Sequence, residues 1–318
     1  MKTVGFPISR KENENRRALL PQDAAKLRYP GQLYIESGYG DVLGFTDADY
    51  EAAGCHITDF AGIMACDIIC DPKIGDEPFL KDLRPGQTVF GWVHAVQHRD
   101  ITDAIALNGA TAYCWEDMFE QGRHVFWRNN EIAGEAAVLH AFQCWGEMPY
   151  NCKVALIGKG NVARGALKIL DRLGADVTVY DRKTEKKFQQ DLEQYDVLVN
   201  GILWDPQRTD HIIYREDLKR LKPGALIVDV SCDAHGGIET SESTTIEDPI
   251  YTVDGVVHYA VDHTPALFYK TVSASLSAEM VNYLDQLMED KPGPVLQECL
   301  IIKDGEILDQ RIIEHQHR

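Results

Sequence analysis

The fold class of this 318-residue chain is decided by Val154-Ala155-Leu156-Ile157-Gly158-Lys159-Gly160-Asn161-Val162-Ala163. An apolar strand runs here into a Gly-x-Gly-x-x-Ala loop and then into a helical stretch that ends near Gly174. A second apolar strand follows and is closed by Asp181. This order of strand, glycine loop, helix and strand is the context that a dinucleotide-binding fingerprint requires. The stretch therefore predicts a Rossmann unit.

Each position of the loop has a chemical reason. Gly158 permits the tight turn, and Gly160 lets the backbone approach a pyrophosphate closely. Ala163 keeps the helix tight against the strand. The helix begins at Asn161 and Val162, whose N–H groups point toward the phosphates and carry the partial positive charge of a helix N-terminus.

The residues after the second strand bear on the choice of cofactor. An acid at the position of Asp181 usually binds the ribose hydroxyls of NAD and repels the extra phosphate of NADP. Arg182 and Lys183 come next and could hold that phosphate. Taken alone, these residues favour NAD(H).

Working outward, residues 196–201 and 224–230 predict later parallel strands, because their nearly continuous apolar runs suit a sheet covered on both faces. The carboxyl ends of these strands should border the cofactor. The candidate lining residues are Gly201, Ile202, Ser231 and Asp233.

The first part of the chain also alternates strands with helical stretches, which argues for a second parallel α/β layer. Amphipathic helices predicted at 132–145 and 273–288 flank the middle of the chain, where it could cross between domains. We therefore expect an α/β protein of two Rossmann-like domains with a cleft between them. Residues 132–274 would form the dinucleotide-binding domain, inserted in a substrate domain of residues 1–131 and 275–318.

Lys73 and His94 follow the predicted strands 67–70 and 88–93. Functional groups in open α/β sheets cluster outside the carboxyl ends of the strands, which makes both residues candidates. By position alone, a solvated lysine and a loop histidine fit as well.

Several segments carry a family resemblance. They are Asn15-Arg16-Arg17-Ala18-Leu19-Leu20-Pro21, residues 67–73 ending in Lys73, Gly91-Trp92-Val93-His94, residues 229–233 with 236–239, and Thr264-Pro265-Ala266-Leu267-Phe268-Tyr269-Lys270. Over nearly its whole length the chain resembles the alanine dehydrogenase / saccharopine dehydrogenase superfamily, and within it the N5-(carboxyethyl)ornithine synthases. Its length is also closer to theirs than to that of alanine dehydrogenases.

The resemblance implies an NAD(P)H-dependent oxidoreductase acting on CH–NH groups, which condenses pyruvate with the side-chain amine of ornithine or lysine. The amine attacks the keto carbon, water leaves, and hydride reduces the imine. His94 is then expected to transfer protons, since its ordinary pKa is near neutral. Lys73 and Arg16 would bind the 2-oxo acid and polarise its carbonyl. Asp233 would orient the amine, and Glu116 stands where the superfamily carries an acid at the substrate site.

The chain departs from the synthase pattern at two positions. The residue before Thr264-Pro265 is His263, where the synthases have asparagine, so the contacts expected of His263, Thr264 and Pro265 with the cofactor change in part. The synthases lack an acid at the position of Asp181 but keep the Arg-Lys pair that follows. The resemblance therefore places NADP(H) ahead of NAD(H).

Three alternatives stay open at this point. Alanine dehydrogenase chemistry would use ammonia as the amine, and saccharopine-type chemistry would use 2-oxoglutarate. A nucleotide-binding sensor without catalysis is the third, and the joint presence of Lys73, His94 and Asp233 argues against it.

Composition limits the partners. The formal net charge of −18 gives no electrostatic attraction to nucleic acid or anionic membranes. No apolar run reaches the roughly 20 residues that span a bilayer, and the N-terminus lacks a signal-peptide pattern. The eight scattered cysteines show no metal-site spacing. We expect a cytoplasmic enzyme without metal, acting on small molecules, and the resemblance implies a homo-oligomer, a tetramer or dimer.

Overall fold

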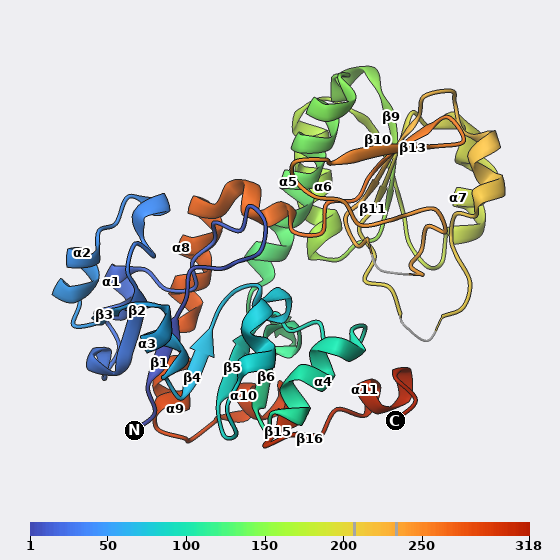
Figure 1. The fold of residues 1–318 in the computed structure, drawn as a ribbon. Coiled ribbons are helices and arrows are strands. Elements are labelled where there is room, and N and C mark those ends of the chain that lie inside the picture. The colour runs from blue at the N-terminus through green and yellow to red at the C-terminus, as the bar shows by residue number, and fades with distance from the viewer. Residues whose placement is uncertain (206–207, 233–234) are drawn as a thin grey trace. The chain divides into compact units, whose positions relative to one another are not determined.

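The computed structural model describes residues 1–205, 208–232 and 235–318, which form two compact units (Figure 1). Unit 1 comprises Met1–Phe126 and Tyr269–Arg318, and unit 2 comprises Trp127–Phe268. The chain passes between them at the first residues of two helices, α5 (Trp127–Trp145) and α8 (Tyr269–Met280). The boundaries expected from the sequence, 131/132 and 274/275, fall inside these two helices.

Unit 1 is built on a sheet whose order is β16-β15-β6-β5-β4-β1-β2-β3 in the described residues. Its strands are β1 (Val4–Phe6), β2 (Leu33–Glu36), β3 (His56–Thr58), β4 (Ile68–Cys70), β5 (Thr88–Gly91), β6 (Thr111–Cys114), β15 (Leu300–Lys303) and β16 (Glu306–Ile307). Strands β1 to β6 pair in parallel, and β15 adds antiparallel to β6. The chain builds outward from β1 in one direction and from β4 in the other. The β1/β4 boundary is therefore a topological switch point, where open α/β sheets bind ligands.

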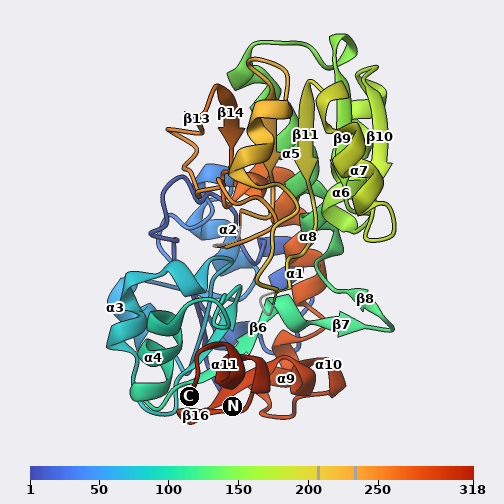
Figure 2. The same cartoon turned by 90° about the vertical axis from the view of Figure 1, so that its right-hand side faces the viewer.

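Short helices surround this sheet. They are α1 (Pro21–Ala24), α2 (Asp47–Ala52), α3 (Phe60–Met64), α4 (Arg99–Leu107), α8, α9 (Leu284–Met288), α10 (Pro294–Glu298) and α11 (Gln310–His315). Figure 2 shows α9, α10 and α11 at the end of unit 1 that holds both chain termini. It also shows the hairpin of β7 (Phe119–Glu120) and β8 (Arg123–His124) projecting from this unit.

The single helix predicted over 273–288 is wrong, because the chain leaves α8 after Met280 and re-enters a helix at Leu284. Met280, Leu284 and Leu287 are all buried. The apolar spacing therefore continues across the break, which is why the pattern suggested one helix.

Unit 2 is a second parallel α/β layer with strand order β10-β9-β11-β12-β14-β13 in the described residues. Its strands are β9 (Lys153–Ile157), β10 (Asp176–Tyr180), β11 (Val197–Asn200), β12 (Leu226–Asp229), β13 (Ile250–Val253) and β14 (Val256–Tyr259). Only β13, at the edge, runs antiparallel among these strands of the described chain. The Rossmann-like α/β class expected from the sequence is thus confirmed.

The sheet of unit 2 is covered on both faces, with α5 and α6 (Asn161–Arg172) on one and α7 (Glu185–Asp191) on the other (Figure 1). Val154 and Leu156 pack in the core that contains α5 and α6. Ala155 and Ile157 pack in the core that contains Phe188 of α7. Alternate residues of β9 therefore enter two different cores, which explains its continuous apolar run.

Two glycines set the close approach of α5 to α6. A Cβ on Gly134 would lie 1.9 Å from the carbonyl oxygen of Val162, and a Cβ on Gly165 would lie 1.8 Å from that of Glu131. Neither position has room for a side chain. The contact holds the first turn of α6, and with it the glycine loop, in place.

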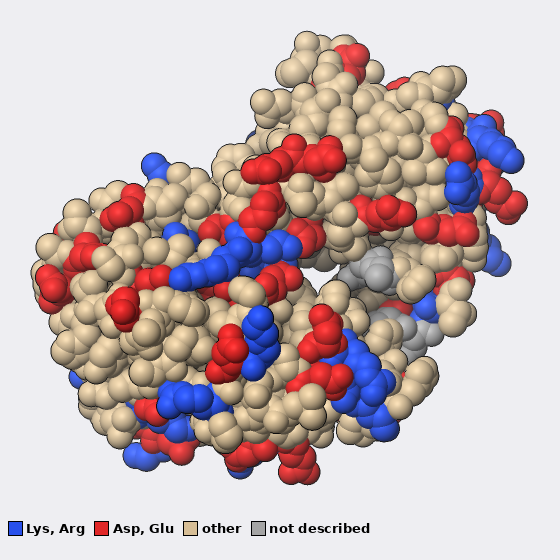
Figure 3. All heavy atoms as spheres, in the orientation of Figure 1, with Lys and Arg blue, Asp and Glu red and all other residues tan. Residues whose placement is uncertain are grey.

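Within the described residues, every helix is too short or too polar to cross a bilayer, and the His, Cys, Asp and Glu side chains form no group of three that could hold a metal ion. On the face drawn in Figure 3, acidic and basic side chains are interspersed over both units. The acidic excess is therefore distributed on this face rather than gathered in one segment.

Candidate functional site

Four predicted substrate-site residues follow the carboxyl ends of neighbouring parallel strands of unit 1. Arg16 lies in the segment after β1, and Lys73 follows β4. His94 follows β5, and Glu116 follows β6. Since β1, β4, β5 and β6 are adjacent in the sheet, their following segments emerge along one edge, which includes the switch point.

Glycine packing brings the segments after β4 and β5 into direct contact. The N–H of Gly75 donates to the carbonyl oxygen of Trp92 at 3.0 Å. A Cβ on Gly75 would lie 2.1 Å from the oxygen of Val93, and a Cβ on Gly91 would lie 1.9 Å from that of Asp71. Only glycine allows backbones to approach so closely. The segments that carry Lys73 and His94 are held against each other by this contact.

Lys73 is a buried cation, with only 6% of its surface exposed. Its Nζ lies 3.0 Å from Oδ2 of Asp76, which follows three residues later. Burial raises the pKa of Asp76, but the charges of Lys73, Lys11 and His94 outweigh burial and leave that pKa below its usual value. Asp76 therefore stays ionised and electrostatically links Lys73 to His94.

His94 and Glu116 form the second contact of this site. The backbone of His94 has φ 55°, in the left-handed region, and its N–H donates to Oε1 of Glu116 at 2.5 Å. The same Oε1 lies 3.5 Å from His94 Nδ1. Burial raises the pKa of Glu116 to about 7, against the opposing effect of the His94 N–H. Oε2 of Glu116 has no hydrogen-bond partner among the described residues. This carboxyl group can thus change charge near neutral pH beside the imidazole.

Arg16 is engaged by Glu14, a partner that the sequence reasoning missed. Its Nε lies 2.8 Å from Oε1 of Glu14, and its Nη2 lies 2.5 Å from Oε2. The guanidinium carbon also lies 5.3 Å from the ring centre of Trp92, two residues before His94. The sequence feature that could have indicated this ion pair is the acid two residues before the arginine. The guanidinium edge expected to meet a substrate carboxylate faces Glu14 in this structure.

The glycine loop of unit 2 has the geometry that a pyrophosphate needs. Gly158 has φ 117°, and a Cβ there would lie 2.9 Å from the carbonyl oxygen of Gly201. A Cβ on Gly160 would meet no atom within 4 Å, so open space lies in front of the loop. Asn161 and Val162 begin α6 at this point, and Ala163 is buried beneath it. Open space at the N-terminus of a twelve-residue helix fits a bound phosphate group.

The end of β10 adds a small pocket beside this loop. It is lined by Ile157, Tyr180, Asp181, Arg182, Glu185, Phe188, Ile202 and Ile212. Apolar walls with a carboxylate at the strand end fit the adenosine half of a dinucleotide. Arg182 lies in the same lining, while the N–H of Lys183 donates to Asp181 Oδ1 at 2.9 Å.

Asp229 organises the ends of β11 and β12, a role that the sequence reasoning also missed. Its Oδ1 accepts from Asn200 Nδ2 at 2.9 Å, from the N–H of Ser231 at 3.2 Å and from the N–H of Cys232 at 3.1 Å. Ser231 Oγ also donates to the carbonyl oxygen of Ile202. The sequence feature that could have indicated this role is the polar residue at the end of each of the two apolar strands. Asp233, predicted to orient the amine, lies outside the described residues.

The segment around His263 packs on α5. His263 is buried, and its Nδ1 lies 2.5 Å from Oδ1 of Asp262. Thr264 Oγ1 donates to the carbonyl oxygen of Ala133 at 3.0 Å. Thr264 and Pro265 begin the 3-10 helix η9 (Thr264–Phe268) and are buried. The histidine that replaces the asparagine expected here is thus held by its neighbouring acid.

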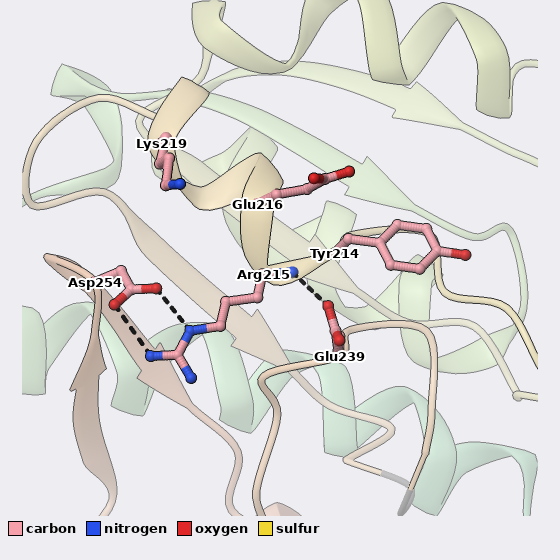
Figure 4. A pocket seen from close by; sticks show the side chains of 6 residues that line it. All are labelled: Tyr214, Arg215, Glu216, Lys219, Glu239 and Asp254. Carbon is pink, nitrogen blue, oxygen red and sulfur yellow. Dashed lines mark hydrogen bonds and ion pairs between the residues drawn. The ribbon is translucent and has the colours of Figure 1, made fainter.

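Figure 4 shows a different hollow on unit 2, lined by Tyr214, Arg215, Glu216, Lys219, Glu239 and Asp254. Arg215 Nε donates to Asp254 Oδ2 at 2.8 Å, and its N–H donates to Glu239 at 2.6 Å. Asp254 lies in the turn before β14, at the amino end of that strand. This hollow lies at the other end of the parallel strands from the glycine loop, so we do not place the cofactor there.

Comparison with known proteins adds to this geometry. The family model described as the N-terminal domain of alanine dehydrogenase/PNT matches residues 5–128, and the model of its C-terminal domain matches residues 182–310. The NAD-binding domain of D-isomer specific 2-hydroxyacid dehydrogenases matches residues 117–238. The N(5)-(carboxyethyl)ornithine synthase of Clostridium botulinum is 32% identical over 312 residues, which cover 90% of this chain and 98% of that protein. The chain belongs to the alanine dehydrogenase/PNT family.

Other members of this family support the assignment. The N(5)-(carboxyethyl)ornithine synthase of Lactococcus lactis is 32% identical, with 86% of this chain and 93% of that protein covered. The alanine dehydrogenase of Mycobacterium tuberculosis is 27% identical, with 97% and 95% covered. A solved L-alanine dehydrogenase shares the fold, with a TM-score of 0.84 at 21% identity over 99% of both chains. As a member of this family, the protein is an oxidoreductase with a nicotinamide-dinucleotide-binding domain.

Proposed function

We propose that the protein condenses pyruvate with the side-chain amine of ornithine or lysine and reduces the product with NAD(P)H to an N-(1-carboxyethyl) amino acid. Unit 1 would bind the two substrates, and unit 2 the cofactor. The observation that carries this proposal is the contact between the segments after β4 and β5, which carry the buried Lys73 and the partly exposed His94, two residues whose charges both keep Asp76 ionised. The similarity to two carboxyethylornithine synthases supports the choice of an amino acid over ammonia.

The cations of unit 1 suit the 2-oxo acid. Lys73 would bind the carboxylate and polarise the keto group, so that the amine can attack its carbon. Arg16 would contribute a second cation if the substrate carboxylate competes with Glu14 for its guanidinium edge.

Proton transfer falls to His94. Formation of the imine releases water, and His94 would supply the proton that the departing oxygen requires. Glu116 would stabilise the protonated imidazole through its contact with Nδ1. The nicotinamide, when bound, supplies the hydride that reduces the imine carbon. The balance is one 2-oxo acid, one amine, one NAD(P)H and one proton consumed, with one secondary amine, one NAD(P)⁺ and one water formed.

The cofactor would contact unit 2 along the carboxyl ends of its strands. The proposed contacts are Gly158, Gly160, Asn161, Val162, Ala163, Asp181, Arg182, Lys183, Gly201, Ile202, Ser231, His263, Thr264 and Pro265. That Asp233 orients the amine stays a prediction. A cytoplasmic homo-oligomer, a tetramer or dimer, is the expected state.

The test is oxidation of NADPH and NADH at fixed pyruvate while the amine is varied among ornithine, lysine and ammonia. Rapid oxidation with ornithine or lysine and little with ammonia is the expected result. Oxidation with ammonia alone would make the protein an alanine dehydrogenase, and activity with 2-oxoglutarate in place of pyruvate would favour saccharopine-type chemistry. Binding of the cofactor without turnover under any pairing would overturn the proposal and favour a sensor.

A further inference from the structure

Lys159, the residue between the two glycines of the loop, forms an ion pair with the acid at the end of β10. Its Nζ lies 2.6 Å from Oδ2 of Asp181. The two residues follow β9 and β10, which are adjacent parallel strands. The lysine side chain is 63% exposed and that of Asp181 28% exposed. The pair therefore stands at the open edge of the sheet, beside the pocket that Asp181 and Arg182 line.

Both oxygens of Asp181 face donors. Oδ1 accepts from the N–H of Lys183 at 2.9 Å and from Thr184 Oγ1 at 3.1 Å. The hydrogen bond from Lys159 is the main reason that the pKa of Asp181 falls to about 2. Asp181 is thus ionised, and its charge is balanced by Lys159 rather than directed at an incoming ligand.

The charged side chains around the pocket include a second cation besides Lys159. Arg182 lines the pocket together with Glu185, which lies 3.5 Å from Arg208, while Arg208 itself pairs with Asp210 at 2.7 Å. Lys159 thus offsets the charge of Asp181, and Arg182 adds a second cation beside it. An acid at the end of this strand ordinarily excludes the 2′-phosphate of NADP. Here that exclusion is cancelled by a cation from the neighbouring strand.

We propose that Lys159 selects the cofactor, by turning from Asp181 to the 2′-phosphate of NADP(H) and, with Arg182, holding it. A lysine suits this task because its ammonium is a point charge on a flexible stem. When the 2′-phosphate is absent, Asp181 is left to accept the ribose hydroxyls of NAD(H). The inference rests on the proposed function only in that unit 2 binds a nicotinamide dinucleotide.

The test measures binding without turnover. Dissociation constants of NADPH, NADH, adenosine 2′,5′-bisphosphate and AMP are determined by titration of the whole protein in the absence of oxo acid and amine. We expect Lys159→Ala to weaken the binding of NADPH and of adenosine 2′,5′-bisphosphate by about tenfold or more, since a charge-assisted contact is lost. NADH and AMP should bind as before or more tightly, because Asp181 is released. Asp181→Asn should strengthen the binding of NADPH relative to that of NADH.

Lys222→Ala is the matched control. Its Nζ lies 2.7 Å from Oδ1 of Asp196, which precedes β11 and so lies at the amino end of the parallel strands, away from the glycine loop. This variant should leave all four constants unchanged. Equal weakening of NADPH and NADH in Lys159→Ala, or no change in either, overturns the inference while leaving the proposed function intact. Failure of the unaltered protein to bind either dinucleotide would overturn both.

Discussion

One carboxylate oxygen of Glu116 contacts two atoms of His94. Oε1 accepts the backbone N–H of His94 at 2.5 Å and lies 3.5 Å from its ring Nδ1. The first contact supports the left-handed backbone of His94, a conformation that costs free energy outside glycine. The second places a titratable carboxyl group beside the ring. Backbone conformation and the charge of the imidazole are therefore coupled to the same side chain.

The first prediction concerns the pH profile. Because burial raises the pKa of Glu116 to about 7, this carboxyl group is protonated below that pH and ionised above it. The ionised form favours the imidazolium of His94, so kcat/KM for the reductive direction should rise as pH increases through about 7. Glu116→Gln should abolish this rise of kcat/KM with pH and lower kcat/KM about tenfold. Asp117→Asn is the control: Asp117 binds Arg311, and loss of its charge should move the pH dependence to lower pH without abolishing it. If kcat/KM of Glu116→Gln still rose through about pH 7, Glu116 would not be the group that sets the pH dependence.

The second prediction concerns binding of the oxo acid. Lys73→Gln should raise the KM for pyruvate at least tenfold, since a charge-assisted contact is lost. Lys11→Gln offers a comparison, because Lys11 Nζ lies 3.9 Å from the same Asp76 oxygen and should change KM by about twofold or less. Steady-state kinetics and circular dichroism of both variants decide the matter. Similar KM values in the two variants would argue that Lys73 only balances the charge of Asp76.

The third prediction concerns the contact between the segments after β4 and β5. Gly75→Ala places a Cβ 2.1 Å from the Val93 oxygen, so the backbones must separate. We expect the free energy of unfolding to fall by about 2 kcal/mol and catalysis to fall with it. Gly31→Ala meets no atom within 4 Å and should keep or slightly increase stability in urea titrations. Unchanged activity in a destabilised Gly75→Ala protein would show that the contact serves stability alone.

The fourth prediction concerns Asp229. Removing its carboxylate in Asp229→Ala leaves Asn200 and the N–H groups of Ser231 and Cys232 without this acceptor. The free energy of unfolding should fall by about 3 kcal/mol. Asp210→Ala removes an exposed pair with Arg208 and should cost less than about 1 kcal/mol. Equal losses in the two variants, measured by denaturant titration, would contradict the organising role of Asp229.

Much of the fold could be predicted because its signals are local. The glycine loop needs a tight turn and a helix start within ten residues, and β9 needs an apolar run, so the stretch 154–163 carries both requirements by itself. Lys73 and His94 could be singled out because strand ends are visible in sequence. Their roles came from resemblance and not from spacing.

Two of the contacts between charged residues depend on tertiary structure. Glu116 reaches His94 across 22 positions, and Lys159 reaches Asp181 across the same number, because parallel strands bring distant ends side by side. Sequence periodicity also could not reveal the break between α8 and α9, since the apolar face stays in register across it. The sequence by itself therefore determined the α/β class, the phosphate loop and the strand ends. Only the tertiary structure decided that Glu116 faces His94 and that Lys159 faces Asp181, because those pairs form between segments that meet after the sheet is assembled.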